Sequence, residues 1–368
     1  MKFSCTRSEL QAAVAIAAKA ASAKSPIPAL EGILIETGLD SVKLTGYDLK
    51  KGIFTSIEAT VSEAGSIVLG ARIFGDIVRS LPEGTVTVRT EGHNAFITCE
   101  NSDFSIIGTD AADYPELPAV DSVSGVKIPQ KLMGDIIRQT IFAVSDSEAR
   151  PVYTGELFEI EDGMLTVVAV DGYRLALRRE PVEGMDGTHS FIVPGNALSD
   201  LEKLCGATDD PVSISLGSKH ISFAIDKTVL ISRRLEGEFL NYKKSVPTSF
   251  RVEVRTDRYA FQRTVERVSL IIDDKIKNPI RCIFGENEIR VVCATGLGKS
   301  KDACIVEGDG GNLEIGFNNR YLLDALKAAP ADEVCICLNT GASPCVITPA
   351  EGEQSFLYMI LPVRLKTE

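Results

Sequence analysis

The chain contains no tryptophan, and its tyrosines and phenylalanines bring the aromatic fraction to only 6%. The hydrophobic cores must therefore be built mainly from aliphatic side chains. No uninterrupted apolar run reaches the length of about 18 residues that a membrane-spanning helix needs, so such a helix is excluded. The opening MKFSCTRSEL has no apolar stretch followed by a small-residue cleavage site. We therefore expect no secretory signal and a cytoplasmic location.

Groups that could ligate a metal are also scarce. The three histidines lie far apart in the sequence, and none of the nine cysteines forms a Cys-x-x-Cys pair. Cys335 and Cys337 are two residues apart, which places both on the same face of a strand. Zinc sites need closely spaced Cys or Cys/His groups. We expect reduced cysteines that serve as small core residues, with no metal and no cofactor.

Catalytic motifs fail on inspection. The segment TGLGKS (295–300) is reminiscent of a phosphate-binding loop, but that motif needs a glycine five residues before Gly298, where this chain has Cys293. The segment also falls at a turn between two predicted strands. The sequence contains no His-Glu-x-x-His, Gly-x-Ser-x-Gly or calcium-loop pattern. We expect no catalytic residues and no enzyme activity.

One type of segment occurs three times, as a short β-like run, a small or polar residue and an amphipathic helix. The copies are SIVLGARIFGDIVRSLP (66–82), SFIVPGNALSDLEKLC (190–205) and LEIGFNNRYLLDALKAA (313–329). Their helical aspartates, Asp76, Asp200 and Asp324, are spaced 124 residues apart in both intervals. Such a fixed period indicates an internal structural repeat.

The rest of each repeat has a common plan. A second helix follows a short strand that begins at Phe3, Val126 or Val252. Alternating apolar residues interrupted by Gly, Asn or Asp indicate antiparallel hairpins between and after the helices. Polar stretches near 118–125 and 247–251 indicate linkers. We therefore predict an α+β fold of three repeated domains, each with two helices on antiparallel sheets, at 1–120, 125–246 and 250–368.

The net charge of −12 would repel nucleic acid if it were spread evenly. The predicted helices, however, contain 12 Lys and Arg residues against 8 Asp and Glu residues. They are 7–20, 72–81, 129–144, 196–205, 256–271 and 318–328. The helices carry +4 and the remaining residues −16. Solvated amphipathic helices explain this pattern, and so does a helical surface that passes close to phosphates.

Several segments, in this order and spacing, resemble the β subunit of bacterial DNA polymerase III, the sliding clamp family. They are the opening MKF, PALEGILIE, LTGYDL and TDAADYPELP in repeat one, VAVDGYRLAL and GEFLNYKKSVP in repeat two, and FNNRYLLDAL and YMILPVRL in repeat three. The resemblance covers essentially the whole chain. It implies a non-catalytic processivity factor that encircles duplex DNA and tethers the replicative polymerase and other DNA-processing proteins, and therefore a nucleoid-associated location.

The resemblance further implies a head-to-tail homodimer whose two chains close a ring, with the helices lining the hole. Domain one of one chain would contact domain three of the other. Phe104 and Ile106 match one side of this interface, and Leu270 and Ile271 match the other. The alternative is that these four residues belong to the cores of their own domains.

The family also has a groove between domains two and three that binds short peptides of the polymerase α subunit, the clamp loader and other partners. The residues that match it are Tyr153, Val170, Gly172, Tyr173, Arg174, Leu175, Leu177, Leu240, Lys244, Val246, Met359, Ile360, Leu361, Pro362, Val363 and Arg364. Aliphatic and methionine side chains would form an adaptable pocket, and the basic residues would bind peptide carbonyls.

The groove departs from the family pattern at four places, which bear on its peptide preference. Val170 replaces a frequent Thr, Tyr173 a common His and Lys244 a common Arg, and Lys366–Glu368 extend beyond the usual end.

On the clamp interpretation, basic residues on or beside the helices would face DNA. They are Lys24, Arg72, Arg79, Lys131, Arg138, Lys203, Arg258, Arg263 and Arg320. Two other interpretations remain open from the sequence. One is a peptide-binding scaffold dimer that does not encircle DNA, and the other is an enzyme with a site between repeats.

Overall fold

The computed structural model describes residues 1–120, 123–183, 187–273, 278–352 and 354–365. Backbone contacts divide the chain into two compact units, Met1–Gly134 with Ser199–Arg234, and Asp135–Leu198 with Leu235–Glu368. The terminal Lys366–Glu368 and part of the first predicted linker, 121–122, lie outside the described residues.

The first unit is built from thirteen strands and the helices α1 (Arg7–Ala18) and α2 (Ala71–Ser80). Its strands are β1 (Lys2–Thr6), β2 (Gly32–Thr37), β3 (Ser41–Tyr47), β4 (Lys51–Glu58), β5 (Thr60–Glu63), β6 (Ser66–Gly70), β7 (Thr85–Glu91), β8 (Asn94–Cys99), β9 (Ser102–Ile107), β10 (Val123–Pro129), β15 (Pro211–Leu216), β16 (His220–Ile225) and β17 (Thr228–Arg233). They form two sheets, in the orders β5-β1-β7-β8-β9 and β10-β15-β16-β17-β4-β3-β2-β6.

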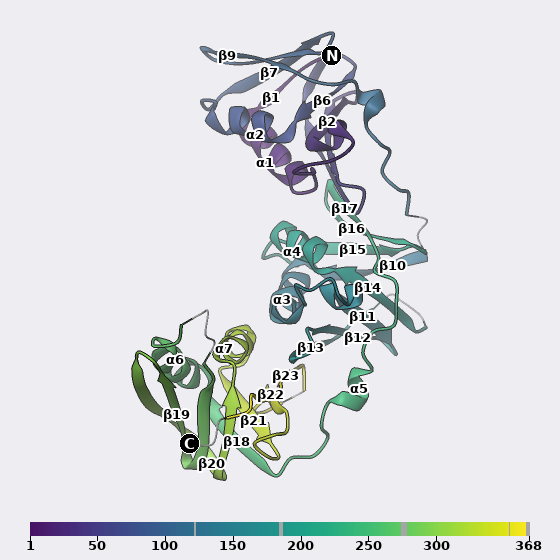
Figure 1. Cartoon of the computed structure of the whole chain (residues 1–368). Helices are drawn as coiled ribbons and strands as arrows, with labels where there is room; N and C mark the ends of the chain where they lie inside the picture. Colours follow the sequence, from purple (N-terminus) through teal and green to yellow (C-terminus); the bar gives the residue numbers. More distant parts are fainter. Residues whose placement is uncertain (121–122, 184–186, 274–277, 353, 366–368) are drawn as a thin grey trace. The chain divides into compact units, whose positions relative to one another are not determined.

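The helices of this unit lie side by side (Figure 1) and cover a largely aliphatic core. Helix α1 is capped by Thr6, whose hydroxyl accepts a hydrogen bond from the backbone N–H of Glu9. Leu10 from α1 and Phe74 from α2 are fully buried between the helices and the strands. Their helical spacing in the sequence therefore produces the buried face that it predicts.

The second unit contains ten strands, the helices α6 (Arg258–Ser269) and α7 (Asn319–Ala328) and the one-turn helix α5 (Tyr242–Ser245). Its strands are β11 (Gly155–Glu161), β12 (Met164–Val170), β13 (Arg174–Pro181), β14 (His189–Pro194), β18 (Val252–Asp257), β19 (Ile280–Thr295), β20 (Gly298–Phe317), β21 (Glu333–Leu338), β22 (Cys345–Pro349) and β23 (Phe356–Ile360). They form one sheet in the order β14-β11-β12-β13-β23-β22-β21-β18-β20-β19. The boundary between the units passes through α3 (Gln130–Thr140) and α4 (Gly195–Leu204).

The sheet of the second unit is buried on two faces. The face covered by α6 and α7 contains a core with Phe261, Leu322 and Tyr358. The opposite face, which we call the outer face, has its own apolar cluster that includes Leu175 and Met359. Because successive strand residues point to opposite faces, neighbouring residues in one strand belong to different cores.

The main expectations of secondary structure are confirmed. Each of the six predicted helical segments contains an α-helix, and α5 lies outside them. TGLGKS forms the turn between β19 and β20, where Thr295 pairs with Gly298. Seven of the nine cysteines are buried, and Cys205 and Cys335 are partly exposed. Among the residues that the structure describes, no helix combines the length and hydropathy needed to span a bilayer.

One buried carboxyl group stands out close to the end of α3. Glu156 on β11 is 0% exposed, and neither of its carboxyl oxygens has a hydrogen-bond partner among the described residues. The nearby hydroxyl of Thr140 donates to the carbonyl oxygen of Ile136. Burial raises the pKa of Glu156 to about 8, and the polar Thr140 offsets this only in part. Glu156 is therefore held as a neutral acid at and below neutral pH.

This protonation state makes the stability of the second unit pH-dependent. The folded state keeps a proton on Glu156 that the unfolded chain releases above its ordinary pKa of 4.5, so stability falls as pH rises from 4.5 to about 8. The limiting slope is about 1.4 kcal/mol per pH unit. We expect Glu156→Gln to raise the thermal unfolding midpoint more at pH 8 than at pH 5. The exposed Glu183→Gln serves as the control, and an equal shift for Glu156→Gln at both pH values would contradict this account.

Candidate functional site

Strand pairing joins consecutive repeats edge to edge. The last strand of repeat two, β17, pairs antiparallel with β4 of repeat one, and Leu230 lies opposite Ile53. The last strand of repeat three, β23, pairs with β13 of repeat two, and Tyr358 lies opposite Ala176. The two junctions thus use equivalent strands in the same orientation.

An ion pair closes each of these junctions. Lys51, at the start of β4, binds the carboxylate of Asp200 on α4, and both side chains are largely buried. Arg174, at the start of β13, binds Asp324 on α7 and also Asp171. Asp200 and Asp324 are two of the three aspartates of the sequence repeat. The repeated aspartates therefore serve the junctions between repeats.

Arg174 has a further set of contacts on the same side of the sheet. Its guanidinium carbon lies 4.4 Å from the ring centroid of Tyr321 and 5.5 Å from that of Phe142. The Tyr173 ring stacks on Tyr321 at a centroid distance of 6.3 Å. Arg174 thus uses its Nε and one Nη on the helix-covered face, and its contact with peptide carbonyls in the groove stays a prediction.

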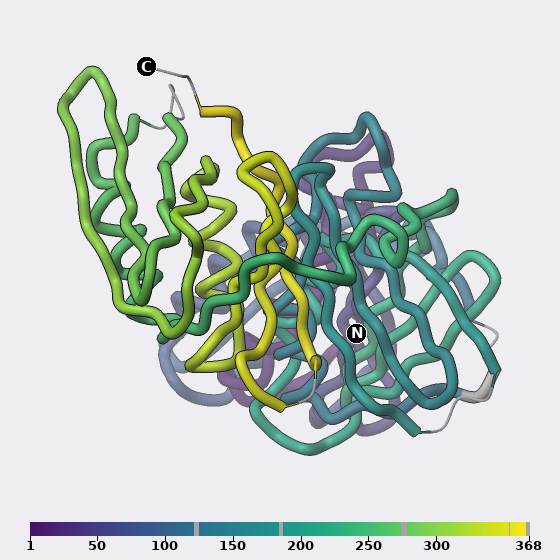
Figure 2. Tube along the Cα trace, turned by 90° about the horizontal axis from the view of Figure 1, so that it is seen from below, coloured from purple at the N-terminus to yellow at the C-terminus, as the bar shows by residue number. Residues whose placement is uncertain are grey.

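The outer face carries a row of residues that lie opposite one another on neighbouring strands. Leu175 pairs with Val170 on one side and Met359 on the other, and Met359 pairs with Val346 on β22. The segment 235–250 crosses this face (Figure 2), and its Leu240 and Val246 pack against the same cluster. An apolar surface bordered by a crossing segment thus forms between strands of repeats two and three.

Seven of the sixteen predicted groove residues come together at this cluster. Val170, Leu175, Leu177 and Met359 are buried in it, and Tyr153, Leu240 and Val246 pack at its margin. The chain then continues through Leu361 and Pro362, which are partly exposed, to Val363 and Arg364, which are exposed. Lys244 is exposed on α5, and Gly172 adopts a φ of 92° in the turn before β13.

Ile360 is an error in the predicted set. It is 1% exposed and belongs to the core beneath the helices, because it neighbours Met359 on a strand and points to the opposite face.

The sequence reading also missed members of the cluster. They are Leu157, Val168, Ile192, Tyr242, Cys337, Val346, Val152, Leu235, Phe239, Phe250, Cys335 and Leu357. Tyr242 is the most informative, because it is 3% exposed and its hydroxyl donates to Glu159 at 2.5 Å. This bond anchors α5, and so the crossing segment, to β11. Side chains alternate strictly between the two sheet faces along β11 and β23. This alternation could have predicted from the sequence that Leu157 and Leu357 lie on the outer face.

Two strand edges without a ladder in the described structure stand out because their counterparts in the other repeats are paired, although other end strands such as β5 and β19 also have a free edge. Strand β9 is the last strand of its sheet. In β20, residues 298–305 pair with β19 on one edge, while the only described pair with β18 is Glu307 with Arg255. By position in the repeat, 298–305 corresponds to β4 and β13, and β9 corresponds to β17 and β23. The free edges are therefore the counterparts of strands that pair elsewhere in the chain.

The predicted interface residues differ in exposure. Phe104 and Ile106 on β9 are partly buried against the core of their own repeat, and Ile271 packs against its own core likewise. Leu270 is 84% exposed. Ile107 on β9 and Leu297 beside β20 are each 81% exposed and were not predicted.

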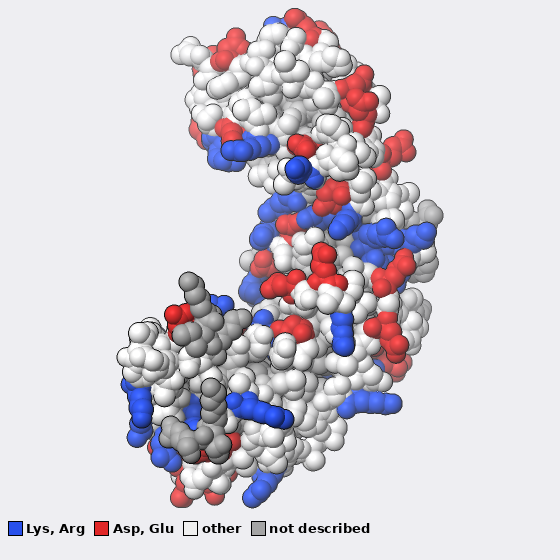
Figure 3. All heavy atoms as spheres, in the orientation of Figure 1, with Lys and Arg blue, Asp and Glu red and all other residues white. Residues whose placement is uncertain are grey.

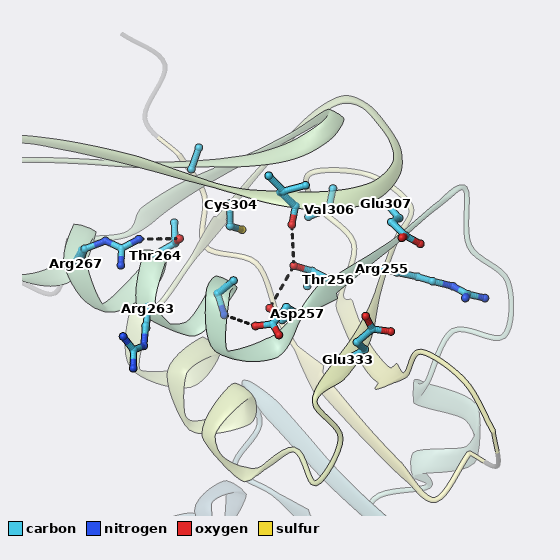
Figure 4. Close-up of a pocket in the computed structure, with 13 residues that line it drawn as sticks. Arg255, Thr256, Asp257, Arg263, Thr264, Arg267, Cys304, Val306, Glu307 and Glu333 are labelled. Atoms are coloured by element: carbon cyan, nitrogen blue, oxygen red, sulfur yellow. Dashed lines mark hydrogen bonds between the residues drawn. The ribbon is translucent and has the colours of Figure 1, made fainter.

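A groove of about 530 Å³ follows the free edge of β20. Figure 4 shows Arg263 and Arg267 extending from α6 on one side, and Cys304 and Val306 on β20. Its floor is polar as well as apolar, since the Thr256 hydroxyl donates to the carbonyl oxygen of Ile305.

The predicted DNA-facing residues are mostly exposed. Eight are at the surface, namely Lys24, Arg72, Arg79, Lys131, Arg138, Lys203, Arg263 and Arg320. Figure 3 shows Lys and Arg side chains gathered where Figure 1 draws α3 and α4. Arg258 contradicts the prediction, because it is 7% exposed and donates to the carbonyl oxygens of Ala331 and Leu326. It is a structural residue at the start of α6.

Three family models match successive parts of the chain. They describe the N-terminal domain of the DNA polymerase III beta subunit at residues 1–118, its central domain at 127–241 and its C-terminal domain at 243–364.

Curated relatives and solved structures agree with these matches. The beta sliding clamp of Halalkalibacterium halodurans is 35% identical over 364 residues, covering 94% of this chain and 95% of the relative. That of Staphylococcus aureus is 34% identical over 359 residues, covering 94% of each chain. The crystal structure of the Bacillus subtilis DNA polymerase sliding clamp has a TM-score of 0.94 at 30% identity, with 100% of both chains covered. The Pseudomonas aeruginosa subunit beta has a TM-score of 0.92 at 26% identity, covering 99% of this chain and 100% of that one.

The repeated domains, the joined sheets and these matches over nearly the whole chain have one explanation. The chain belongs to the DNA polymerase III beta subunit family, the bacterial sliding clamps.

Proposed function

We propose that this protein is a DNA sliding clamp, in which two chains close head to tail into a ring around duplex DNA and hold a polymerase on it. The domains of the clamp are 1–120, 125–246 and 250–368. The proposal rests on one observation above all: two equivalent junctions are formed inside the chain, and the two strands that would form a third are free. A head-to-tail contact that closes on itself removes both free edges.

The internal junctions define a register for the third one. The equivalent pairs of the three hairpins, each five residues apart in sequence, are Tyr47–Gly52, Val170–Leu175 and Ala294–Lys299. We apply the pairing registers of the two internal junctions to β20 of one chain and β9 of another chain. In that register Phe104 lies opposite Ser300. In the same register Ile107 lies opposite Leu297. Two highly exposed aliphatic side chains would thereby bury each other, which favours association.

The third junction would lack the ion pair of the other two. Gly298 occupies the position of Lys51 and Arg174, so Asp76 would meet no equivalent cation there. Asp76 instead forms a surface ion pair with Arg79. A junction without this buried contact is the natural place for the ring to open for DNA.

The helices supply a surface that attracts DNA weakly and does not bind it tightly. Eight of the predicted basic residues are exposed, whereas the acidic Asp200 and Asp324 are occupied by the junction ion pairs. The net charge of the exposed helical surface is therefore more positive than the net helical charge counted from the sequence. A weakly positive lining neutralises few phosphates at once, so it permits sliding and does not depend on base sequence. A scaffold that never encloses DNA would give this surface no role.

The outer-face cluster is the proposed docking site for partners. It would take apolar anchors of short peptides from the replicative polymerase, the clamp loader and other DNA-processing proteins. Leu361 and Tyr153 at its margin remain accessible to such anchors. The clamp has no reaction of its own and works in the cytoplasm at the nucleoid.

The dimer is tested at Ile107, because this side chain is exposed and its replacement leaves the core of domain one intact. Ile107→Asp would place a charge opposite Leu297, so we expect the dimer dissociation constant to rise at least about tenfold. Leu39→Asp is the matched control, since Leu39 is 90% exposed far from the free edges in sequence. Sedimentation equilibrium measures both variants. An Ile107→Asp protein that dimerises as tightly as the control would refute the proposed junction.

The groove is tested at Leu361, which is partly exposed, whereas Met359 is buried within the sheet. We expect Leu361→Ala to weaken binding of a clamp-binding peptide of the replicative polymerase about tenfold, or about 1.4 kcal/mol, and to lower processive synthesis. Met164→Ala is the control, because Met164 is 40% exposed on β12 outside the cluster. Fluorescence anisotropy on the folded dimer gives the affinities. Equal affinities for the two variants would place the partner site elsewhere.

A further inference from the structure

Two cysteines belong to the outer-face cluster and continue its row on the side of Val346 away from Met359. Val346, which pairs with Met359, also pairs with Cys337 on β21. Cys335 lies two residues earlier on the same face, opposite Arg255 on β18 and Thr348 on β22. The two thiols therefore stand on the face that carries the peptide groove, two strands away from Met359, or about 10 Å.

The two thiols differ in environment. Cys337 is 5% exposed, whereas Cys335 is partly exposed. The Cys337 thiol donates a hydrogen bond to the Cys335 sulfur at an Sγ–Sγ distance of 3.5 Å. This bond lowers the pKa of Cys335, and Arg255 contributes in the same direction against burial and Glu253. Burial raises the pKa of Cys282, Cys304 and Cys345, which leaves Cys335 the more nucleophilic thiol.

Cys335 also opens onto a cavity large enough for a reagent. The cavity has a volume of about 680 Å³ and is lined by Pro247 and Phe250 from the segment before β18, by Arg255 and by Leu357, besides the two cysteines. Small-molecule sites in proteins have volumes of roughly 300–1,000 Å³. An adduct on Cys335 therefore has space beside it in the folded protein.

An internal disulfide between the two cysteines does not fit the strand. Residues two apart on one extended strand have Cβ atoms about 6.6 Å apart, whereas a disulfide needs about 3.5–4.5 Å. Cys337 can thus hydrogen-bond to the Cys335 sulfur but cannot close a bond with it while β21 stays paired. A group attached to Cys335 would not be expelled by its neighbour.

We propose that Cys335 is a modification site for low-molecular-weight disulfides, with Cys337 as the residue that holds its thiolate. The Cys335 thiolate attacks one sulfur of the disulfide, a new S–S bond to Cys335 forms and the original S–S bond breaks. The second half of the reagent leaves as a thiolate and takes a proton from solvent. The reaction is an exchange, so no further oxidant is needed. The cavity shares Arg255 and Glu307 with the groove along β20, but the proposal does not rest on the proposed DNA or dimer surfaces.

The experiment uses the full chain and 2,2′-dithiodipyridine, an uncharged disulfide whose leaving thiopyridone absorbs light. We expect a fast phase that releases one equivalent, and mass mapping that places the adduct on Cys335. Cys335→Ser should remove this phase. Cys205→Ser, which alters the other partly exposed cysteine, should leave it unchanged. Persistence of the fast phase in Cys335→Ser would overturn the proposal.

The role of Cys337 is read from the pH dependence of the fast phase. Cys337→Ala removes the donor, so the midpoint of the rate profile should move to higher pH and the rate at pH 7 should fall several-fold, because the smaller thiolate fraction is only partly offset by its higher nucleophilicity. Cys337→Ser keeps a hydroxyl donor and should restore most of the rate. An unchanged profile in Cys337→Ala would show that Cys337 does not hold the thiolate. Release of a second equivalent, with loss of both thiols, would reveal an internal disulfide and also contradict the proposal.

Discussion

The edge of a β-sheet carries backbone N–H and C=O groups that need partners, and this requirement organises the whole chain. Each repeat ends its sheets with a strand that could pair again. Inside the chain the requirement is met twice, by β17 on β4 and by β23 on β13, so the boundary between compact units runs through the middle repeat. At the equivalent positions of the third junction, β9 and β20 each keep an edge with unpaired N–H and C=O groups in the described structure. A second copy of the chain offers both in the complementary order.

The side chains at the junctions adapt this common backbone scheme to different needs. Lys51 and Arg174 bind helix aspartates at the permanent junctions, where a buried charge left without its partner would be costly. Gly298 stands at the third position, and the exposed Ile107 and Leu297 supply apolar surface there. An apolar contact can form and separate without leaving a buried charge unpaired. The same aspartates are neutralised where they face the permanent junctions, which leaves the basic residues to set the potential of the helical surface.

The sequence was a good guide to what is periodic. The 124-residue spacing of Asp76, Asp200 and Asp324 predicted the repeats, and helical spacing predicted the helices. The resemblance named seven residues of the outer-face cluster, but individual side chains depended on contacts that no pattern records. Ile360 lies on the far face from Met359 because strands alternate. Arg258 is buried because carbonyl groups from α7 and the following loop happen to end beside it.

Arg174 shows most clearly what the sequence pattern does not predict, because its partner Asp324 is 150 residues away in sequence. A motif such as VDGYRLAL contains both the turn and the strand, yet it does not say which face the arginine serves. Long-range pairing decides that, and only the folded chain provides it. The opposite holds for Leu175 and Leu177, whose alternation in the same motif already predicted a shared face.

Encirclement is the central claim, and retention on circular DNA tests it most directly. Labelled protein is loaded onto nicked circular duplex by its clamp loader, washed in high salt and followed before and after one double-strand cut. Few phosphates are neutralised, so high salt should remove protein that is bound only by charge. The account predicts that the protein stays on the intact circle and leaves as soon as the cut provides ends. Equal loss from intact and cut DNA would contradict it.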